Sequence, residues 1–144
     1  MASCLRMAAT LDALEPIREF VEEAAALAGL DRKRSYRLML AVDEIATNVI
    51  THGYQEAGLT GDLTVSRELD DGALTITLED DAIPFDPHSL AEPSDLDAPV
   101  EERSVGGLGV FLTIRGVDSF VYRRIGERNH NIFVMKRQEG ADVD

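Results

Sequence analysis

The hydrophobic pattern of this chain switches from a helical period to a period of two, and this switch limits the fold more than any other feature. Apolar residues between positions 12 and 52 recur at helical spacing, which predicts two amphipathic helices. Residues 62–69 and 73–79 instead alternate between apolar and polar side chains, which predicts two strands. The pattern therefore indicates a fold that packs helices against a sheet.

Most of the predicted strands are joined by short turns and should pair in antiparallel fashion. Asp70-Asp71-Gly72 separates the first two. Two further segments, SFVYRRI and NIFVMKR, alternate in the same way around a turn at Gly126. Residues 5–9 predict a short strand before the helices. We expect an α/β (α+β) two-layer sandwich, in which helices cover one face of a mixed, mostly antiparallel sheet.

Residues with known capping preferences mark the expected helix ends. Asp12 is a candidate N-cap for the first helix and Gly29 a candidate stop. Asp31 is a candidate N-cap for the second helix, which Gly53 would end as a C-cap glycine. We expect a third, short helix over residues 107–116, where glycines open it.

Composition excludes several classes of function. The chain has 144 residues, which suits a single domain, and its net charge is −13. Nucleic-acid binding requires a basic face, and the sequence indicates none. No apolar run approaches a membrane span, and Cys4 alone cannot form an intrachain disulfide. We therefore expect a cytoplasmic domain over residues 1–138 that binds neither nucleic acid nor membranes, with an acidic tail at 139–144.

The segment DEIATNVITHGY places Glu44, Asn48 and His52 along one stripe of the second helix. One interpretation is the polar edge of an amphipathic helix. The other is an oxygen-ligand site, since carboxylate and amide oxygens suit a hard cation such as Mg²⁺ and a glutamate can act as a base. His52, His88 and His130 show no metal-ligand spacing.

Two further stretches have both a structural and a functional interpretation. Residues 80–87, DDAIPFDP, form either an acidic turn or an acceptor for an exocyclic amine such as that of adenine. Residues 106–109, GGLG, form either a flexible hinge or a phosphate cradle at a helix N-terminus, with Arg103 just upstream. The segment between them shows no periodicity, which predicts a long loop of the kind that serves as a lid.

Taken in order, the three stretches resemble the N box, G1 box and G2 box of the GHKL (Bergerat-fold) ATPase superfamily. EIATN followed by THGY resembles the N box, DDAIPFDP the G1 box and GGLG the G2 box. AVDEIATNVITHGY and PFDP, together with the small size, resemble the anti-sigma factor serine kinases of the RsbW and SpoIIAB type. The resemblance covers about residues 11–137 and implies a histidine kinase-like ATPase fold that binds ATP and Mg²⁺.

The resemblance implies a role for each matching residue of the first two boxes. Asn48 would coordinate the Mg²⁺ that bridges the ATP phosphates, and Glu44 would act as the catalytic base or orient the attacking hydroxyl. Asp80 would accept a hydrogen bond from the adenine amine. Ala82 and Phe85 belong to the same cofactor-binding loop.

The resemblance implies that the G2 box and the residues just before it complete the part of the site that binds the ATP phosphates. Gly107, Leu108 and Gly109 would bring backbone N–H groups to the phosphates, and Arg103 would reach one of them. Residues 86–104 would form the ATP lid.

Two residues depart from the family pattern. Ala82 stands where the G1 box usually has glycine, so its methyl group either crowds the adenine or is harmless if the backbone keeps a negative φ. Val134 stands where we expect a threonine of the last strand near the adenine. Both departures bear on the strength of ATP binding, and neither touches the phosphate or magnesium residues.

The resemblance implies an enzyme, a kinase that transfers the γ-phosphoryl group of ATP to a Ser or Thr of an anti-anti-sigma (STAS-domain) partner and sequesters a sigma factor. It also implies a homodimer. A second hypothesis is a partner-switch module that binds ATP with little or no kinase activity. A third is a detached histidine-kinase catalytic domain, which would need a separate protein because nothing before Asp12 could hold a phospho-accepting helix.

Overall fold

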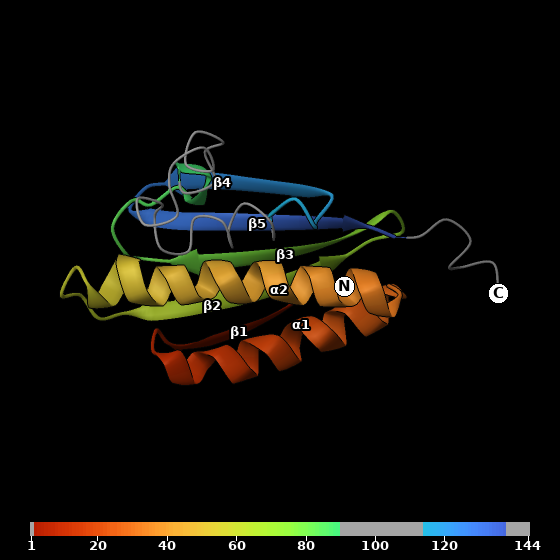
Figure 1. Ribbon diagram of the computed structural model, residues 1–144, viewed down its shortest axis with the longest axis horizontal. Helices are drawn as coiled ribbons and strands as arrows, with labels where there is room; N and C mark the ends of the chain where they lie inside the picture. The colour runs from red at the N-terminus through yellow and green to blue at the C-terminus, as the bar shows by residue number, and fades with distance from the viewer. Residues whose placement is uncertain (1, 90–113, 138–144) are drawn as a thin grey trace, which may run out of the picture.

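The computed structural model describes residues 2–89 and 114–137, which form two layers (Figure 1). One layer is a five-stranded sheet in the order β1-β2-β3-β5-β4, and every neighbouring pair in it is antiparallel. The helices α1 and α2 lie side by side on one face of this sheet. The predicted α/β two-layer sandwich is confirmed, and within the described residues the sheet is antiparallel throughout rather than mixed.

The elements follow the predicted order. The strands are β1, Ala2–Ala8; β2, Asp62–Leu69; β3, Ala73–Asp80; β4, Ser119–Ile125; and β5, Arg128–Lys136. The helical segments are a 3₁₀ turn, Leu11–Ala13; α1, Leu14–Ala28; α2, Arg32–Asn48; a π-helical segment η2, Val49–Gln55; and a second 3₁₀ turn, Pro87–Ser89. The third helix expected over 107–116 lies almost wholly outside the described residues.

Two of the four expected helix caps, Gly29 and Asp31, are confirmed, and the other two, Asp12 and Gly53, are wrong. Gly29 ends α1 with a φ of 74°, and the Asp31 carboxylate caps α2 by accepting from the Arg34 N–H at 2.8 Å. Asp12 is not a cap, because it lies inside the 3₁₀ turn that runs directly into α1. A capping residue needs an extended backbone, and the residue before α1, Ala13, already has helical φ and ψ.

Gly53 does not end α2, contrary to the prediction. The backbone continues through Val49–Gln55 in wider π-helical turns, in which the Glu56 N–H donates to the Thr51 carbonyl at 2.9 Å. The left-handed glycine comes later, at Gly58, with a φ of 70°. Gly53 does not have a left-handed backbone; a side chain at this position would instead collide with Ala82.

Both predicted hairpins are confirmed. The Asp70 carboxylate closes the first turn by accepting from the N–H groups of Gly72 and Ala73, at 2.7 and 2.8 Å. Gly126, with a φ of 61°, lies in the second turn. Two strands begin earlier than the pattern predicted, β1 at Ala2 and β5 at Arg128, because pairing with β2 and β3 extends them.

The core lies between the helices and the sheet. On β3 every second residue is buried, so Leu74, Ile76 and Leu78 point toward the helices. Burying each such side chain contributes about 1.5–3 kcal/mol. The same alternation carries the next inward position, Asp80, to the interior at the end of the strand. Fully buried apolar side chains of the helices complete the core, among them Ile17, Val21, Leu38, Val42 and Ile45.

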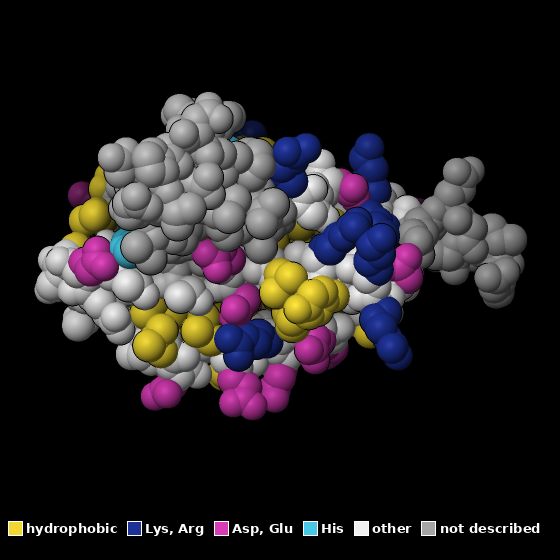
Figure 2. Space-filling model, viewed as in Figure 1, with side chains coloured by type: hydrophobic (Ala, Val, Ile, Leu, Met, Phe, Trp, Pro, Cys, Tyr) yellow, Lys and Arg dark blue, Asp and Glu magenta, His cyan; other side chains and the backbone are white. Residues whose placement is uncertain are grey.

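The surface is uneven in charge. Figure 2 shows basic side chains gathered at the end of the molecule where α2 begins, and Arg32, Lys33, Arg34 and Arg37 lie in that part of the helix. Acidic side chains are scattered over the rest of this face. No helix in the described ranges is both long and apolar enough to cross a membrane.

Candidate functional site

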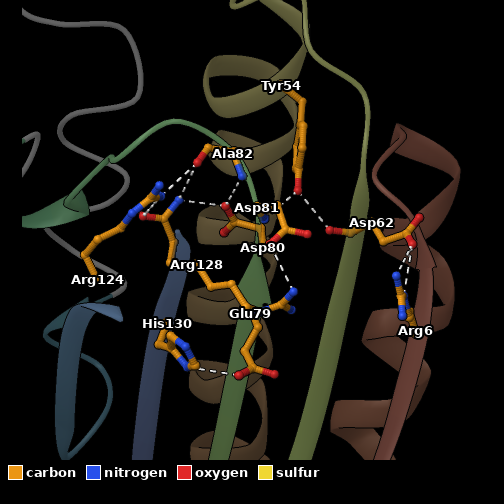
Figure 3. Close-up of polar contacts among 11 residues, drawn as sticks. Arg6, Tyr54, Asp62, Glu79, Asp80, Asp81, Ala82, Arg124, Arg128 and His130 are labelled. Atoms are coloured by element: carbon orange, nitrogen blue, oxygen red, sulfur yellow. Dashed lines mark hydrogen bonds and ion pairs between the residues drawn. The ribbon is translucent and has the colours of Figure 1, made fainter. Parts of the chain in front are cut away.

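Asp80 is fully buried at the carboxyl end of β3, where several polar side chains converge (Figure 3). Its Oδ1 accepts from the Ala82 N–H at 2.9 Å and from Asn129 Nδ2 at 2.7 Å. Its Oδ2 is buried and has no hydrogen-bond partner. Burial raises the pKa of Asp80, against the lowering effect of these two hydrogen bonds. A buried acceptor without a donor is costly, so this atom is suited to a donor from a ligand.

Asn129 joins the loop after β3 to the β4–β5 hairpin. Its Nδ2 also donates to the Ile83 carbonyl at 2.9 Å. Its Oδ1 accepts from the Tyr122 hydroxyl and from Arg124 Nη1, the latter at 3.1 Å. Arg124 Nη1 also donates to the Ala82 carbonyl at 2.9 Å. The loop that follows the buried aspartate is therefore held by side chains of the adjacent β4–β5 hairpin.

Tyr54 fixes the same loop from the helical side. Its buried hydroxyl accepts from the Asp81 N–H at 2.8 Å and donates to the Asp62 carbonyl at 2.9 Å. Burial is the main cause that raises the pKa of Tyr54. The tyrosine of THGY thus connects the π-helical segment to both neighbouring strands.

The methyl group of Ala82 packs against this helical segment. Ala82 is buried, and a Cβ added to Gly53 would lie 2.9 Å from the Ala82 Cβ. Among the described residues, only glycines have positive φ, so an alanine at position 82 is not strained. The backbone at Ala82 therefore meets the condition of negative φ under which its methyl group is expected to be harmless.

On α2, Asn48 and Glu44 lie one turn apart as predicted. Asn48 is 5% exposed, and its Nδ2 donates to the Glu44 carbonyl at 2.9 Å. This hydrogen bond engages the amide nitrogen and so orients the side chain. Glu44 is half-buried. Within the described parts of the chain, no ion pair engages its carboxylate.

His52 does not continue this stripe in α-helical register. It lies in the π-helical segment, where a turn takes more than four residues. Its Nδ1 pairs with Glu56 Oε1 at 3.0 Å, and its ring lies 6.2 Å from that of Phe85, between centroids. Phe85 is half-buried and donates its N–H to the Tyr122 hydroxyl at 3.3 Å. His52 therefore contacts the loop rather than extending the polar stripe.

The expectation for Val134 is wrong. In the sheet register, Asp80 pairs with Asn129, whereas Val134 pairs with Thr75. Val134 is thus five positions along the strand, roughly 16 Å away at 3.3 Å per residue. The residue beside Asp80 is Asn129, because β5 begins earlier than its apolar pattern indicates.

The remaining residues of the expected site lie outside the described residues. These are Arg103, Gly107, Leu108, Gly109 and the lid beyond residue 89. Nothing in the structure tests their roles.

Sequence patterns missed the polar contacts that hold the site together. Asn129, Tyr122 and Arg124 come from the C-terminal hairpin, far along the chain from the aspartate. One signal was present: strands are poor in asparagine, yet Asn129 and Asn131 alternate with His130 at the start of β5.

The family described as the histidine kinase-like ATPase domain matches residues 7–136. The chain belongs to the histidine kinase-like ATPases. This ATPase domain is similar to the serine-protein kinase RsbW of Bacillus cereus (strain B4264), with 33% identity over 78 residues, which cover 52% of this chain and 48% of the relative. RsbW of Bacillus thuringiensis (strain Al Hakam) is 31% identical over 78 residues, with the same coverage. The domain therefore spans about half the length of the curated relatives it matches.

A solved structure confirms the GHKL fold of this ATPase domain. The histidine kinase domain from the Erythrobacter litoralis EL346 blue-light activated histidine kinase aligns with a TM-score of 0.56. The alignment covers 90% of this chain and 62% of that chain, with 16% sequence identity.

The described residues of this histidine kinase-like ATPase domain fit a purine nucleotide with a divalent cation. The buried, unpartnered Oδ2 of Asp80 suits the donor hydrogen of an exocyclic amine. The amide oxygen of Asn48 suits a hard cation. In both side chains the other polar atom, Asp80 Oδ1 or Asn48 Nδ2, is held by a hydrogen bond within the domain.

Proposed function

We propose that this domain binds ATP with Mg²⁺ and acts as a serine/threonine-protein kinase of the anti-sigma factor type. The observation that carries the proposal is the fully buried Asp80 carboxylate, whose Oδ2 lacks a partner. An adenine amine would supply the missing donor, and burial would make that hydrogen bond selective, because water cannot replace it.

The phosphate end of the nucleotide would lie near α2. Asn48 would ligate Mg²⁺ through Oδ1, since its Nδ2 is held by the Glu44 carbonyl at 2.9 Å. Arg103 and the backbone of Gly107, Leu108 and Gly109 would hold the phosphates. When bound, Mg²⁺–ATP would supply the phosphoryl group and neutralise part of its charge.

Glu44 is the proposed catalytic base. It lies one helical turn before Asn48, and its carboxylate is not committed to an ion pair with any described residue. It would take the proton of a serine or threonine hydroxyl, or orient that hydroxyl for attack. Asp43, the neighbouring carboxylate, is by contrast bound to Arg18 Nε at 2.7 Å.

The proposed substrate is a serine or threonine of a folded STAS-domain partner, and the proposed second partner is a sigma factor held inactive. The names of the Bacillus relatives, serine-protein kinase RsbW, support a protein serine as acceptor. We further propose a cytoplasmic homodimer. The net charge of −13 favours association through basic surfaces of partners, which would weaken as salt rises.

Incubation of the purified protein with γ-labelled ATP, Mg²⁺ and candidate STAS proteins tests the kinase activity. Label on a partner serine or threonine, lost in Glu44→Gln, is the expected result. ATP binding without transfer to any partner would instead support the module with little or no kinase activity. Light scattering tests the dimer, and a mass near 15.8 kDa would contradict it.

A further inference from the structure

A groove between the two helices opens to solvent near the beginning of α2. It has a volume of ≈ 260 Å³ and is lined by Glu22 of α1 and by Arg32, Ser35, Tyr36 and Met39 of α2. The four α2 residues recur at helical spacing and so form one stripe along the helix. Tyr36 is 57% exposed, and Met39 is partly buried against the core. This α1–α2 groove therefore presents an aromatic ring and a thioether to solvent.

Three basic side chains at the start of α2 border this groove and are not engaged within the domain. Arg32, Lys33 and Arg37 are exposed, and within the described parts of the chain their side chains make no hydrogen bond or ion pair. Arg34 is different, because its Nη1 donates to the Lys136 carbonyl at 2.6 Å and so joins α2 to β5. Figure 2 shows a hydrophobic patch on this face that adjoins the basic side chains.

These cations do not stabilise the helix that carries them. The N-terminus of an α-helix carries a partial positive charge, so acidic residues are favourable in its first turn and basic residues are not. The first turn of α2 has no acidic residue and begins with Arg32 and Lys33. The cluster also contrasts with the net charge of −13. A local charge pattern that opposes its own helix is typical of a functional surface.

We propose that the α1–α2 groove is a docking surface for an acidic amphipathic helix of a partner protein. The apolar side of that helix would pack on Tyr36 and Met39, as helices do in apolar grooves. Its acidic residues would pair with Arg32, Lys33 and Arg37, which gives the complex its specificity and its association rate. The stripe from Arg32 to Met39 is roughly 10 Å long, so two to three turns of a partner helix would cover it.

A lipid bilayer fits this face less well than a single helix does. A flat anionic surface would also meet the acidic side chains that Figure 2 shows over the rest of the face. The net charge of −13 would add to that repulsion. A helix covers only the groove and its basic end. Because Glu22 lines the groove as well, the occupant should carry its acidic residues toward the end where α2 begins.

The groove is separate from the proposed nucleotide site. At 1.5 Å per residue, Tyr36 lies roughly 18 Å along α2 from Asn48. A helix docked on the groove would therefore not compete directly with ATP for the same residues. The inference does not depend on the proposed function, and each can fail without the other.

Fluorescence anisotropy with synthetic peptides tests the docking on the full-length protein. The probe is a labelled peptide of about four helical turns, with leucines on one face and glutamates elsewhere. One control has the same composition with the leucines spread around the helix, and the other has lysines in place of the glutamates. The probe should bind at least about tenfold more tightly than either control, and added salt should weaken it. Equal binding of the three peptides, or no binding of the probe, would overturn the proposal.

Arg37→Glu and Arg123→Glu are a matched pair of variants. Both arginines are exposed and both substitutions change the net charge equally, but Arg123 lies on β4. Arg37→Glu should weaken binding of the probe by about tenfold or more, and Arg123→Glu by less than about twofold. Tyr36→Ala should weaken it by about threefold or more, because the ring is the proposed apolar anchor. Equal losses in the two charge variants would show that net charge alone attracts the probe.

Two further measurements distinguish the occupants and the cost to the helix. Lys33→Glu should weaken probe binding yet raise Tm by roughly 1–4 °C, because it places an acid in the first turn of α2. A lower Tm would show that Lys33 is kept for folding and would contradict the proposal. Binding of wild type to phosphatidylserine vesicles that is lost in Arg37→Glu would assign the surface to a membrane. Light scattering that shows a dimer lost in Arg37→Glu would assign it to a second copy of the chain, and either result overturns the proposal.

Discussion

Gly53 and Ala82 face each other, and the absence of a side chain at Gly53 leaves room for the Ala82 methyl group. An added Cβ at Gly53 would lie 2.9 Å from the Ala82 Cβ, closer than two such atoms can approach. The two residues belong to η2 and to the loop after β3, so their contact sets the distance between the helical segment and the buried aspartate. The proposed nucleotide site depends on that distance.

Gly53→Ala should destabilise the domain by about 1–3 kcal/mol, because the new methyl group would overpack the contact. Gly53 has no positive φ, so alanine is not strained by the backbone there. The double variant Gly53→Ala with Ala82→Gly should therefore recover most of the loss. Urea unfolding of both measures this, and a Gly53→Ala variant as stable as the wild type would exclude the close contact.

Tyr54→Phe should destabilise the domain by about 1–3 kcal/mol and weaken nucleotide affinity. The change removes the partner of the Asp81 N–H and of the Asp62 carbonyl, and so loosens the loop that positions Asp80. Tyr36→Phe is the matched control, since Tyr36 is 57% exposed and should change stability by less than about 0.5 kcal/mol. Equal unfolding midpoints for the two variants in urea would contradict the role of Tyr54.

Asp80→Asn should remove most nucleotide binding while stabilising the nucleotide-free protein at pH 7. Burial raises the folded-state pKa of Asp80 above its ordinary value of 3.8, so the folded protein favours the protonated form. The contribution of Asp80 to the free energy of unfolding is therefore fully present below pH 3.8, the ordinary pKa, and is lost as the pH rises through the raised pKa of the folded state. Thermal unfolding against pH should show the advantage of Asp80→Asn shrinking as pH falls toward 3.8. A constant difference would contradict the raised pKa.

Asn48→Ala should remove most of the effect of Mg²⁺ on ATP affinity, because the amide Oδ1 is the proposed metal ligand. Calorimetry with and without Mg²⁺ measures this. Thr47→Ala serves as the control, since the Thr47 hydroxyl donates to the Asp43 carbonyl of its own helix, at 2.8 Å. An unchanged magnesium effect in Asn48→Ala would rule out the assignment.

Glu44→Gln should leave nucleotide affinity nearly intact while lowering phosphoryl transfer by ~10²-fold or more, the usual effect of losing a general base. Asp43→Asn is the matched control on the same helix, because the Asp43 carboxylate is bound to Arg18 rather than facing a hydroxyl. Rates of label transfer from ATP to a STAS partner distinguish the two. Equal rates in Glu44→Gln and the wild type would eliminate Glu44 as the base.

Local signals in the sequence determined the elements and part of the site. The alternation of buried and partly buried residues along β3 places Asp80 on the inward face. Asp31 caps α2 by accepting a hydrogen bond from the Arg34 N–H in the first turn of that helix. The helical spacing of Glu44 and Asn48 places both on one side of α2. These features depend on residues close together in the chain, so a periodic pattern or a motif is enough to predict them.

Only the tertiary structure decided what surrounds those residues. Register between β3 and β5 places Asn129 and Asn131 beside Asp80 and moves Val134 away. Packing of η2 against a distant loop gives Gly53 a steric role in place of the predicted cap. Strand register and the closeness of two segments follow from the packing of the whole core. One strand's own pattern gives the face of each residue but not its neighbour on the next strand.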